Sequence, residues 1–109
     1  MIRQRYRVEE KPDVFDDYIA IAAHVDRWTS DRALADRTVD AIRAFIKSLN
    51  SVPDRGTKRD DLRPGLRIGP FKKRTAIAIE IDDEAKVVAI LRVFYGGQDY
   101  EAVLNRTPE

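Results

Sequence analysis

The chain of 109 residues has no cysteine at all and only one histidine. Without cysteine it can form no disulfide, no zinc–thiolate centre and no thiol nucleophile. No stretch approaches the roughly 18 apolar residues that a membrane-spanning helix needs. The basic N-terminal residues are not followed by the apolar segment of a secretion signal. We therefore expect a cytoplasmic protein with no contact to a membrane.

Motifs of the common catalytic and nucleotide sites are also missing. The sequence has no nucleophile elbow, no Walker loop and no dinucleotide-binding fingerprint. Its lone histidine, His24, lies in a predicted helix, where packing or surface exposure is the commoner role. Neighbouring acids such as Asp16 and Asp17 diverge by about 100° on a helix and converge poorly on one ion. We expect neither a metal nor a cofactor.

What is present is the composition of a globular domain with a heavily charged surface. Hydrophobic residues make up 43% of the chain and charged residues 36%. This hydrophobic content is too high for a disordered chain, and the length suits a single domain over residues 1–109.

Hydrophobic periodicity predicts a strand at residues 3–10 and then a helical hairpin over about 12–50. Pro12 and Asp13 open the first helix, and residues 29–31 separate it from the second. Apolar residues recur every three or four positions on both helices. The stripes are Val14, Tyr18, Ile21, Ala22, Val25 and Trp28, and then Leu34, Thr38, Ala41, Ile42, Phe45 and Leu49.

The second half of the chain has the pattern of a sheet. A basic loop at 51–65 precedes a sheet region at 66–95, and a short C-terminal segment at 96–109 has room for one helical turn. Three strands close in sequence favour an antiparallel meander. The order strand–helix–helix–strand–strand–strand predicts a two-layer α+β domain with the hairpin on one face of the sheet and the other face partly open.

The last predicted strand contains one charge among apolar residues. Strict alternation puts Ile90, Arg92 and Phe94 on one face. A charge there must face solvent or meet a partner. Two readings remain open: an ion pair with a carboxylate such as Glu80, or an anion-binding residue on the open face beside Arg67 or Arg74.

Positive charge gathers around one turn. Residues 54–74 hold eight basic and three acidic residues, whereas the whole chain is only +1. This polarity indicates a docking surface for an acidic partner, although a solvated turn beside a lysine-protected edge strand would look the same. The candidate binding residues are Arg63, Arg67, Lys72, Lys73, Arg74 and Arg92.

Two motifs resemble the ParE-type toxins of the RelE/ParE toxin–antitoxin superfamily. They are the turn "DDLRPGLR", which leads into a basic edge strand, and the terminal "ILRVFYGGQDYEAVL". The resemblance covers residues 5–104. It implies the RelE/ParE-like fold and a toxin, encoded in a two-gene operon of the kind associated with plasmid stabilization.

The resemblance implies a ParE-like inhibitor of DNA gyrase, neutralised by a ParD-like antitoxin with which it forms a complex, as a homodimer or a heterotetramer. The alternative is a RelE-like nuclease that cuts messenger RNA on the ribosome without a metal. Its candidate catalytic residues are Arg67, Arg74, Arg92 and Tyr95. No base is evident among them, because a tyrosine with a pKa of about 10 is a poor base at neutral pH. A third reading is a degenerate, non-toxic relative that acts as a binding module.

Overall fold

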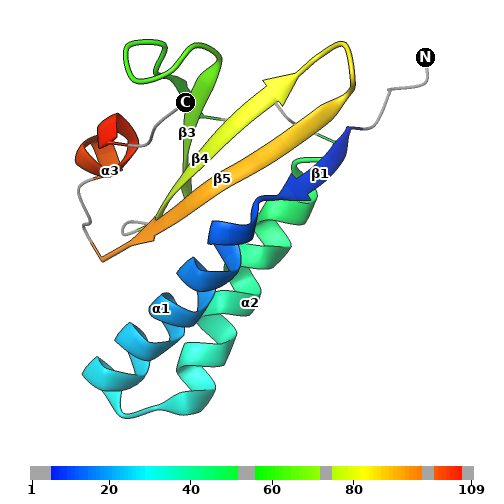
Figure 1. The fold of residues 1–109 in the computed structure, drawn as a ribbon. Helices are drawn as coiled ribbons and strands as arrows, with labels where there is room; N and C mark the ends of the chain where they lie inside the picture. Colours follow the sequence, from blue (N-terminus) through cyan, green and yellow to red (C-terminus); the bar gives the residue numbers. More distant parts are fainter. Residues whose placement is uncertain (1–5, 52–55, 72–74, 97–99, 107–109) are drawn as a thin grey trace.

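The computed structural model describes residues 6–51, 56–71, 75–96 and 100–106, and its elements follow the predicted order (Figure 1). In chain order they are β1 (Arg7–Glu10), α1 (Pro12–Thr29), α2 (Arg32–Ser48), β2 (Thr57–Lys58), β3 (Leu66–Phe71), β4 (Thr75–Asp82), β5 (Val87–Tyr95) and α3 (Tyr100–Arg106). The α+β prediction is confirmed. Two short elements refine it: β2 lies inside the predicted loop, and the C-terminal turn is a seven-residue helix.

The strands form one mixed sheet with the order β1-β5-β4-β3-β2. Strands β3, β4 and β5 are the expected antiparallel meander. The N-terminal strand adds a parallel edge, because β1 pairs with β5 in the register that sets Arg7 opposite Val87. The first and last strands of the described residues are therefore neighbours.

Local signals set the limits of the helical hairpin. Pro12 occupies the first turn of α1, where its missing N–H is not needed. Ser30 adopts a left-handed conformation (φ 52°) that ends α1. The side chain of Asp31 then accepts a hydrogen bond from Leu34 N at 3.0 Å and caps α2. Ser30 and Asp31 thus reverse the chain direction between the two helices, which pack against each other.

The main core lies between the hairpin and the sheet. α1 packs on both β5 and α2. The predicted stripe of α1 is buried except at its end, where Trp28 is 74% exposed. The reason is visible in Figure 1: the tip of the hairpin extends beyond the end of the sheet. On α2, burial centres on residues that the predicted stripe partly missed, namely Ala35, Ile42, Ile46 and Leu49.

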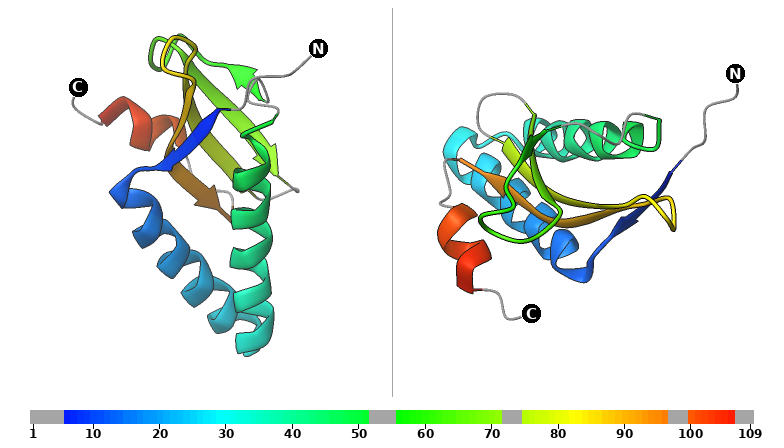
Figure 2. Two further views of the ribbon diagram at one scale, coloured as in Figure 1. Left: turned by 90° about the vertical axis from the view of Figure 1, so that its right-hand side faces the viewer. Right: turned by 90° about the horizontal axis from the view of Figure 1, so that it is seen from above.

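A second, smaller core lies on the opposite face of the sheet, beneath α3, so α2 and α3 lie on opposite sides (Figure 2). It consists of Leu66, Ile68, Ala78, Phe94 and Leu104. The second face is thus partly open, as predicted, with α3 covering one end of it.

A β-bulge changes the face assignment of β5. Ala78 lies opposite Arg92, whereas its neighbour Ile79 lies opposite Ile90, so β5 holds one extra residue. Ile90 consequently belongs to the hairpin core and Phe94 to the core under α3. The expectation that Ile90 shares a face with Arg92 was wrong, because it assumed strict alternation. Phe94 does share that face, and the Arg92 guanidinium lies 5.4 Å from the centre of its ring.

One carboxylate accepts a hydrogen bond from the edge of β5 just beyond the end of β1. Asp17 of α1 accepts a hydrogen bond from Val93 N at 2.8 Å. It also accepts two from Arg92, at 2.9 Å from Nε and 2.8 Å from Nη2. The Asp17 side chain is only 8% exposed. The hydrogen bonds to Asp17 raise the pKa of Arg92. The buried Asp17 carboxylate is thus neutralised by Arg92 and hydrogen-bonded at both of its oxygens.

A tyrosine fastens the junction of β1 and α1. The Tyr18 hydroxyl donates to Glu10 at 2.5 Å, and the Arg43 guanidinium lies 5.4 Å from the centre of its ring. Burial, followed by the hydrogen bond to Glu10, raises the pKa of Tyr18. Because the neutral phenol is the stabilised form, this contribution holds below pH 10 and is lost only at higher, alkaline pH.

We expect Asp17→Asn to lower the free energy of unfolding by about 2–4 kcal/mol, since it removes one charge of a largely buried pair. Asp16→Asn, one residue away and exposed, is the matched control and should change stability by less than about 0.5 kcal/mol. Urea unfolding at pH 7 measures both. Equal stabilities for the two variants would contradict the role of Asp17.

Candidate functional site

The basic turn is tied to α3 by one arginine. Arg59 donates to Asp61 at 2.9 and 2.8 Å and also to Glu101 on α3. These hydrogen bonds raise the pKa of Arg59, and the bond from Arg59 lowers the pKa of Asp61. This arginine therefore acts as a structural clamp, with its donors already engaged.

Two of the predicted binding residues also meet partners. Arg63 lies 3.5 Å from Glu80, the carboxylate that we had assigned to Arg92. Arg67 donates to the Gly56 carbonyl at 3.4 Å and stands opposite Lys58 in the strand register. Lys58 and Arg67 line a small pocket of about 190 Å³, and acidic residues in the same lining balance their positive charge. The other predicted residues of this group lie outside the described part of the chain: Lys72, Lys73 and Arg74.

The sheet separates Arg67 from Arg92. Arg67 is opposite Ile79, a residue of the hairpin core, whereas Arg92 is opposite Ala78, which lies in the core under α3. The two arginines start from opposite faces and from strands that are not neighbours. Arg92 is bound to Asp17, so the ion-pair reading describes it, with a partner different from the one expected.

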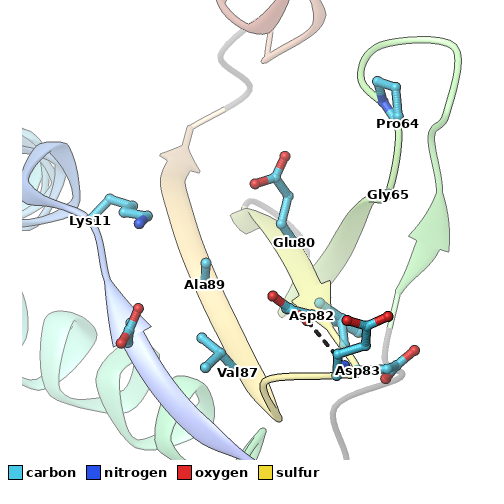
Figure 3. A pocket seen from close by; sticks show the side chains of 11 residues that line it. Lys11, Pro64, Gly65, Glu80, Asp82, Asp83, Val87 and Ala89 are labelled. Atoms are coloured by element: carbon cyan, nitrogen blue, oxygen red, sulfur yellow. Dashed lines mark hydrogen bonds between the residues drawn. The ribbon is translucent and has the colours of Figure 1, made fainter. Parts of the chain in front are cut away.

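The uncovered part of the second face forms a shallow groove of about 590 Å³ (Figure 3). Glu80 rises from its floor beside the small residue Ala89, and Lys11 reaches in from the β1 side. We had expected arginines on this face, but the groove is mainly acidic. The acids that line it are Glu9, Glu80, Asp82, Asp83 and Glu84.

An aromatic notch lies where the hairpin overhangs the end of β5. The His24 ring packs edge-on against Tyr95 at 5.7 Å between centroids, and Trp28 lies 6.1 Å from His24 on the other side. The cavity measures about 570 Å³. Sequence reasoning found no histidine near the candidate tyrosine, because 71 residues separate His24 from Tyr95. Leu34 and Thr38 of α2 close the far wall.

These positions leave the predicted nuclease residues dispersed within the described part of the chain. Tyr95 is opposite Thr75, four residues from Ile79 and thus about 13 Å along β4 from the position of Arg67. The described lining of the aromatic notch includes no arginine or lysine to bind a phosphate. Among residues 6–51, 56–71, 75–96 and 100–106, no group of acidic and histidine side chains could hold a metal ion. Over the same residues, no helix is long and apolar enough to cross a membrane.

Solved structures share this architecture. The chain superposes on a structure of the chromosomal ParDE toxin–antitoxin system from P. aeruginosa with a TM-score of 0.71 and 20% identity, covering 84% of this chain and 97% of that one. It also matches the RelBE2 toxin–antitoxin complex from Mycobacterium tuberculosis, with a TM-score of 0.62, 20% identity and coverage of 84% and 99%. The fold is therefore that of proteins found in toxin–antitoxin systems.

The sequence itself defines the family. The model of the ParE toxin of the type II toxin–antitoxin system parDE matches residues 8–100. This match spans every element from β1 to the start of α3. The chain belongs to the ParE toxin family. A search of curated proteins gave no match.

The aromatic notch depends on a glycine. Gly96 has φ 73°, and a β-carbon there would lie 3.3 Å from His24 Nε2. Gly65 has a similar φ of 79° but open space around it, and so provides a control for backbone strain alone. Each change to alanine should lower the free energy of unfolding by about 1–2 kcal/mol through strain.

Gly96→Ala should cost more than Gly65→Ala, because it also displaces His24. It should shift the proton resonances of the His24 ring, which Gly65→Ala should leave in place. Urea unfolding and NMR measure the two effects. Equal losses and an unchanged histidine spectrum would show that the close approach of Gly96 to His24 is unimportant.

Proposed function

We propose that the chain is a ParE-like toxin that inhibits DNA gyrase in the cytoplasm by protein–protein binding. A cognate ParD-like antitoxin neutralises it in a complex, in which the toxin is a homodimer or part of a heterotetramer. Inhibition through a surface needs no reaction centre and no cofactor.

The observation that carries this proposal is the engagement of Arg92. In the nuclease alternative this arginine would bind the phosphate of the RNA. Its guanidinium instead makes two hydrogen bonds to Asp17, and freeing it would leave a buried carboxylate unpaired. Binding RNA there would therefore cost several kcal/mol before any contact with the substrate is made.

The antitoxin site that we propose lies along β3 and the turn before it. Arg67 and Lys58 project together toward the hairpin side of the sheet. An acidic antitoxin segment suits this side better than the acidic groove of the opposite face. The full proposed set is Arg63, Arg67, Lys72, Lys73 and Arg74.

One observation favours the nuclease alternative, namely the contact between His24 and Tyr95. A histidine can serve as a general base near neutral pH, where tyrosine cannot. The described residues around this pair offer no cation, so we rank this function second.

Two assays on the purified chain separate these functions. With gyrase and supercoiled plasmid, we expect cleavage complexes or a loss of supercoiling activity. With translating ribosomes, we expect no cut message. Cut message without any effect on gyrase would establish the nuclease instead, provided that the His24→Ala variant loses the cutting activity. Activity in neither assay would favour the non-toxic relative.

We expect Arg67→Glu with Arg74→Glu to weaken antitoxin binding about 10-fold or more, because like charges would then face each other. The protein encoded beside the chain, co-expressed and then separated, serves as the ligand in calorimetry. Arg32→Glu with Arg37→Glu makes the same change in net charge on the solvent side of α2 and is the control. Similar affinities for both double variants would exclude the β3 surface.

A further inference from the structure

Trp28 lies at the rim of the aromatic notch and is left largely in water. It is 74% exposed, and it is the only tryptophan of the chain. Beside it opens the cavity of about 570 Å³, with the rings of His24 and Tyr95 in its wall. The tip of the hairpin carries Trp28 beyond the end of the sheet (Figure 1). An exposed tryptophan and a hollow are therefore neighbours on one surface.

The described lining of the notch holds no acid, lysine or arginine. Its two threonine hydroxyls are already engaged within their own helices. Thr29 donates to the Val25 carbonyl at 2.7 Å, and Thr38 donates to the Leu34 carbonyl at 2.8 Å. Neither hydroxyl therefore needs a polar ligand. In a chain with 36% charged residues, this lining forms an uncharged, largely apolar and aromatic patch.

The lack of charge in the described lining discriminates between possible occupants. An acidic antitoxin segment would find no cation there to pair with, and a nucleic acid would find none to hold its phosphates. A partner that fits must itself present an uncharged apolar or aromatic surface, as the centres of protein interfaces do. The chain presents such a surface, because the exposed Trp28 borders the same notch.

Two-fold symmetry makes this patch complementary to itself. In a two-fold contact the same surface of both copies meets, so every contact between two residues forms twice. Trp28 of one copy would lie against His24 and Tyr95 of the other copy, and the reverse contact would form at the same time. The exposed residues that flank Trp28 in the chain carry both signs, Arg27 before it and Asp31 after it, so they can pair between the copies.

The other exposed apolar pair of the described residues, Phe15 and Ile19, offers no such closed arrangement. These residues lie about 140° and 180° away from Trp28 around the axis of α1. Their insertion into the notch of another copy would join two different surfaces. Contacts of that kind produce rings or open chains of molecules rather than a dimer.

We propose that the aromatic notch, with Trp28 at its rim, is the contact surface of a two-fold symmetric dimer, in which a second copy of the chain is the occupant. The inference rests on the proposed function in one respect, since it assigns a surface to the homodimer named there. Stable interfaces bury about 1,200–2,000 Å², and the notch is a small surface, so we expect a weak dimer with a dissociation constant of about 1–100 μM.

The single tryptophan reports on this contact directly. Sedimentation velocity of the purified full chain, from about 1 to 500 μM, should show a monomer–dimer equilibrium without larger species. Over the same range, the fluorescence emission of Trp28 should shift to shorter wavelength, because its indole ring leaves water as the dimer forms. The two measurements should give the same dissociation constant.

Variants then locate the contact. Trp28→Ser should raise the dissociation constant about 10-fold or more, since both copies lose an aromatic anchor. Thr29→Lys keeps the tryptophan but adds a charge to the wall of the notch, and should raise the constant about 5-fold and reduce the fluorescence shift accordingly. Phe15→Ser with Ile19→Ser is the matched control on the outer side of α1 and should change it less than about 2-fold. All four residues are exposed, and circular dichroism checks that the variants fold.

Four results would overturn the proposal. The first is a monomer over the whole concentration range, and the second is a dimer that Trp28→Ser leaves intact. The third is a dimer that the outer-side control dissociates. The fourth is growth beyond the dimer, because different surfaces would then be in contact. These measurements use the chain alone, so their failure removes only the dimer surface, and the inhibition of gyrase keeps its separate assay.

Discussion

Just beyond the end of β1, β5 presents a backbone N–H at an open edge, and the side chain of Asp17 bonds it. The same carboxylate binds Arg92, so one acid fixes α1 against the sheet edge and neutralises the only charge among the apolar residues of β5. A buried acid would be costly alone, and so would the arginine. Together they fix the position of α1, and through α1 that of α2 and the aromatic notch.

Much of the fold could be predicted because its signals are local. Helix limits follow from Pro12 and the cap at Asp31, and the strands follow from alternation and turns. The bulge in β5 could not be seen, since it depends on pairing with β4. Trp28 continues the stripe of α1 perfectly well, but its exposure depends on where the sheet ends in space.

The site was harder to predict because its partners are distant in sequence. Arg92 was recognised as a charge that needs an explanation, but Asp17 lies 75 positions earlier. A signal did exist: Asp17 is three residues after Val14 and four before Ile21, so it lies on the buried side of α1. An acid in an apolar stripe requires a basic partner. The pairing of Arg63 with Glu80 had no comparable signal, since Glu80 simply follows the alternation of β4 and Arg63 lies in a turn where charged residues need no partner.

The parallel contact between β1 and β5 also bears on how the protein is made. β1 emerges from the ribosome before β5, and the residues that it pairs with, Val87 to Ile90, come some 80 positions later. Contacts between such distant segments form late, since a long loop must close before they can contribute. A nascent chain that stops before β5 lacks both the strand that pairs with β1 and the strand on which α1 packs. The producing cell therefore meets the folded toxin only after β5 has been translated.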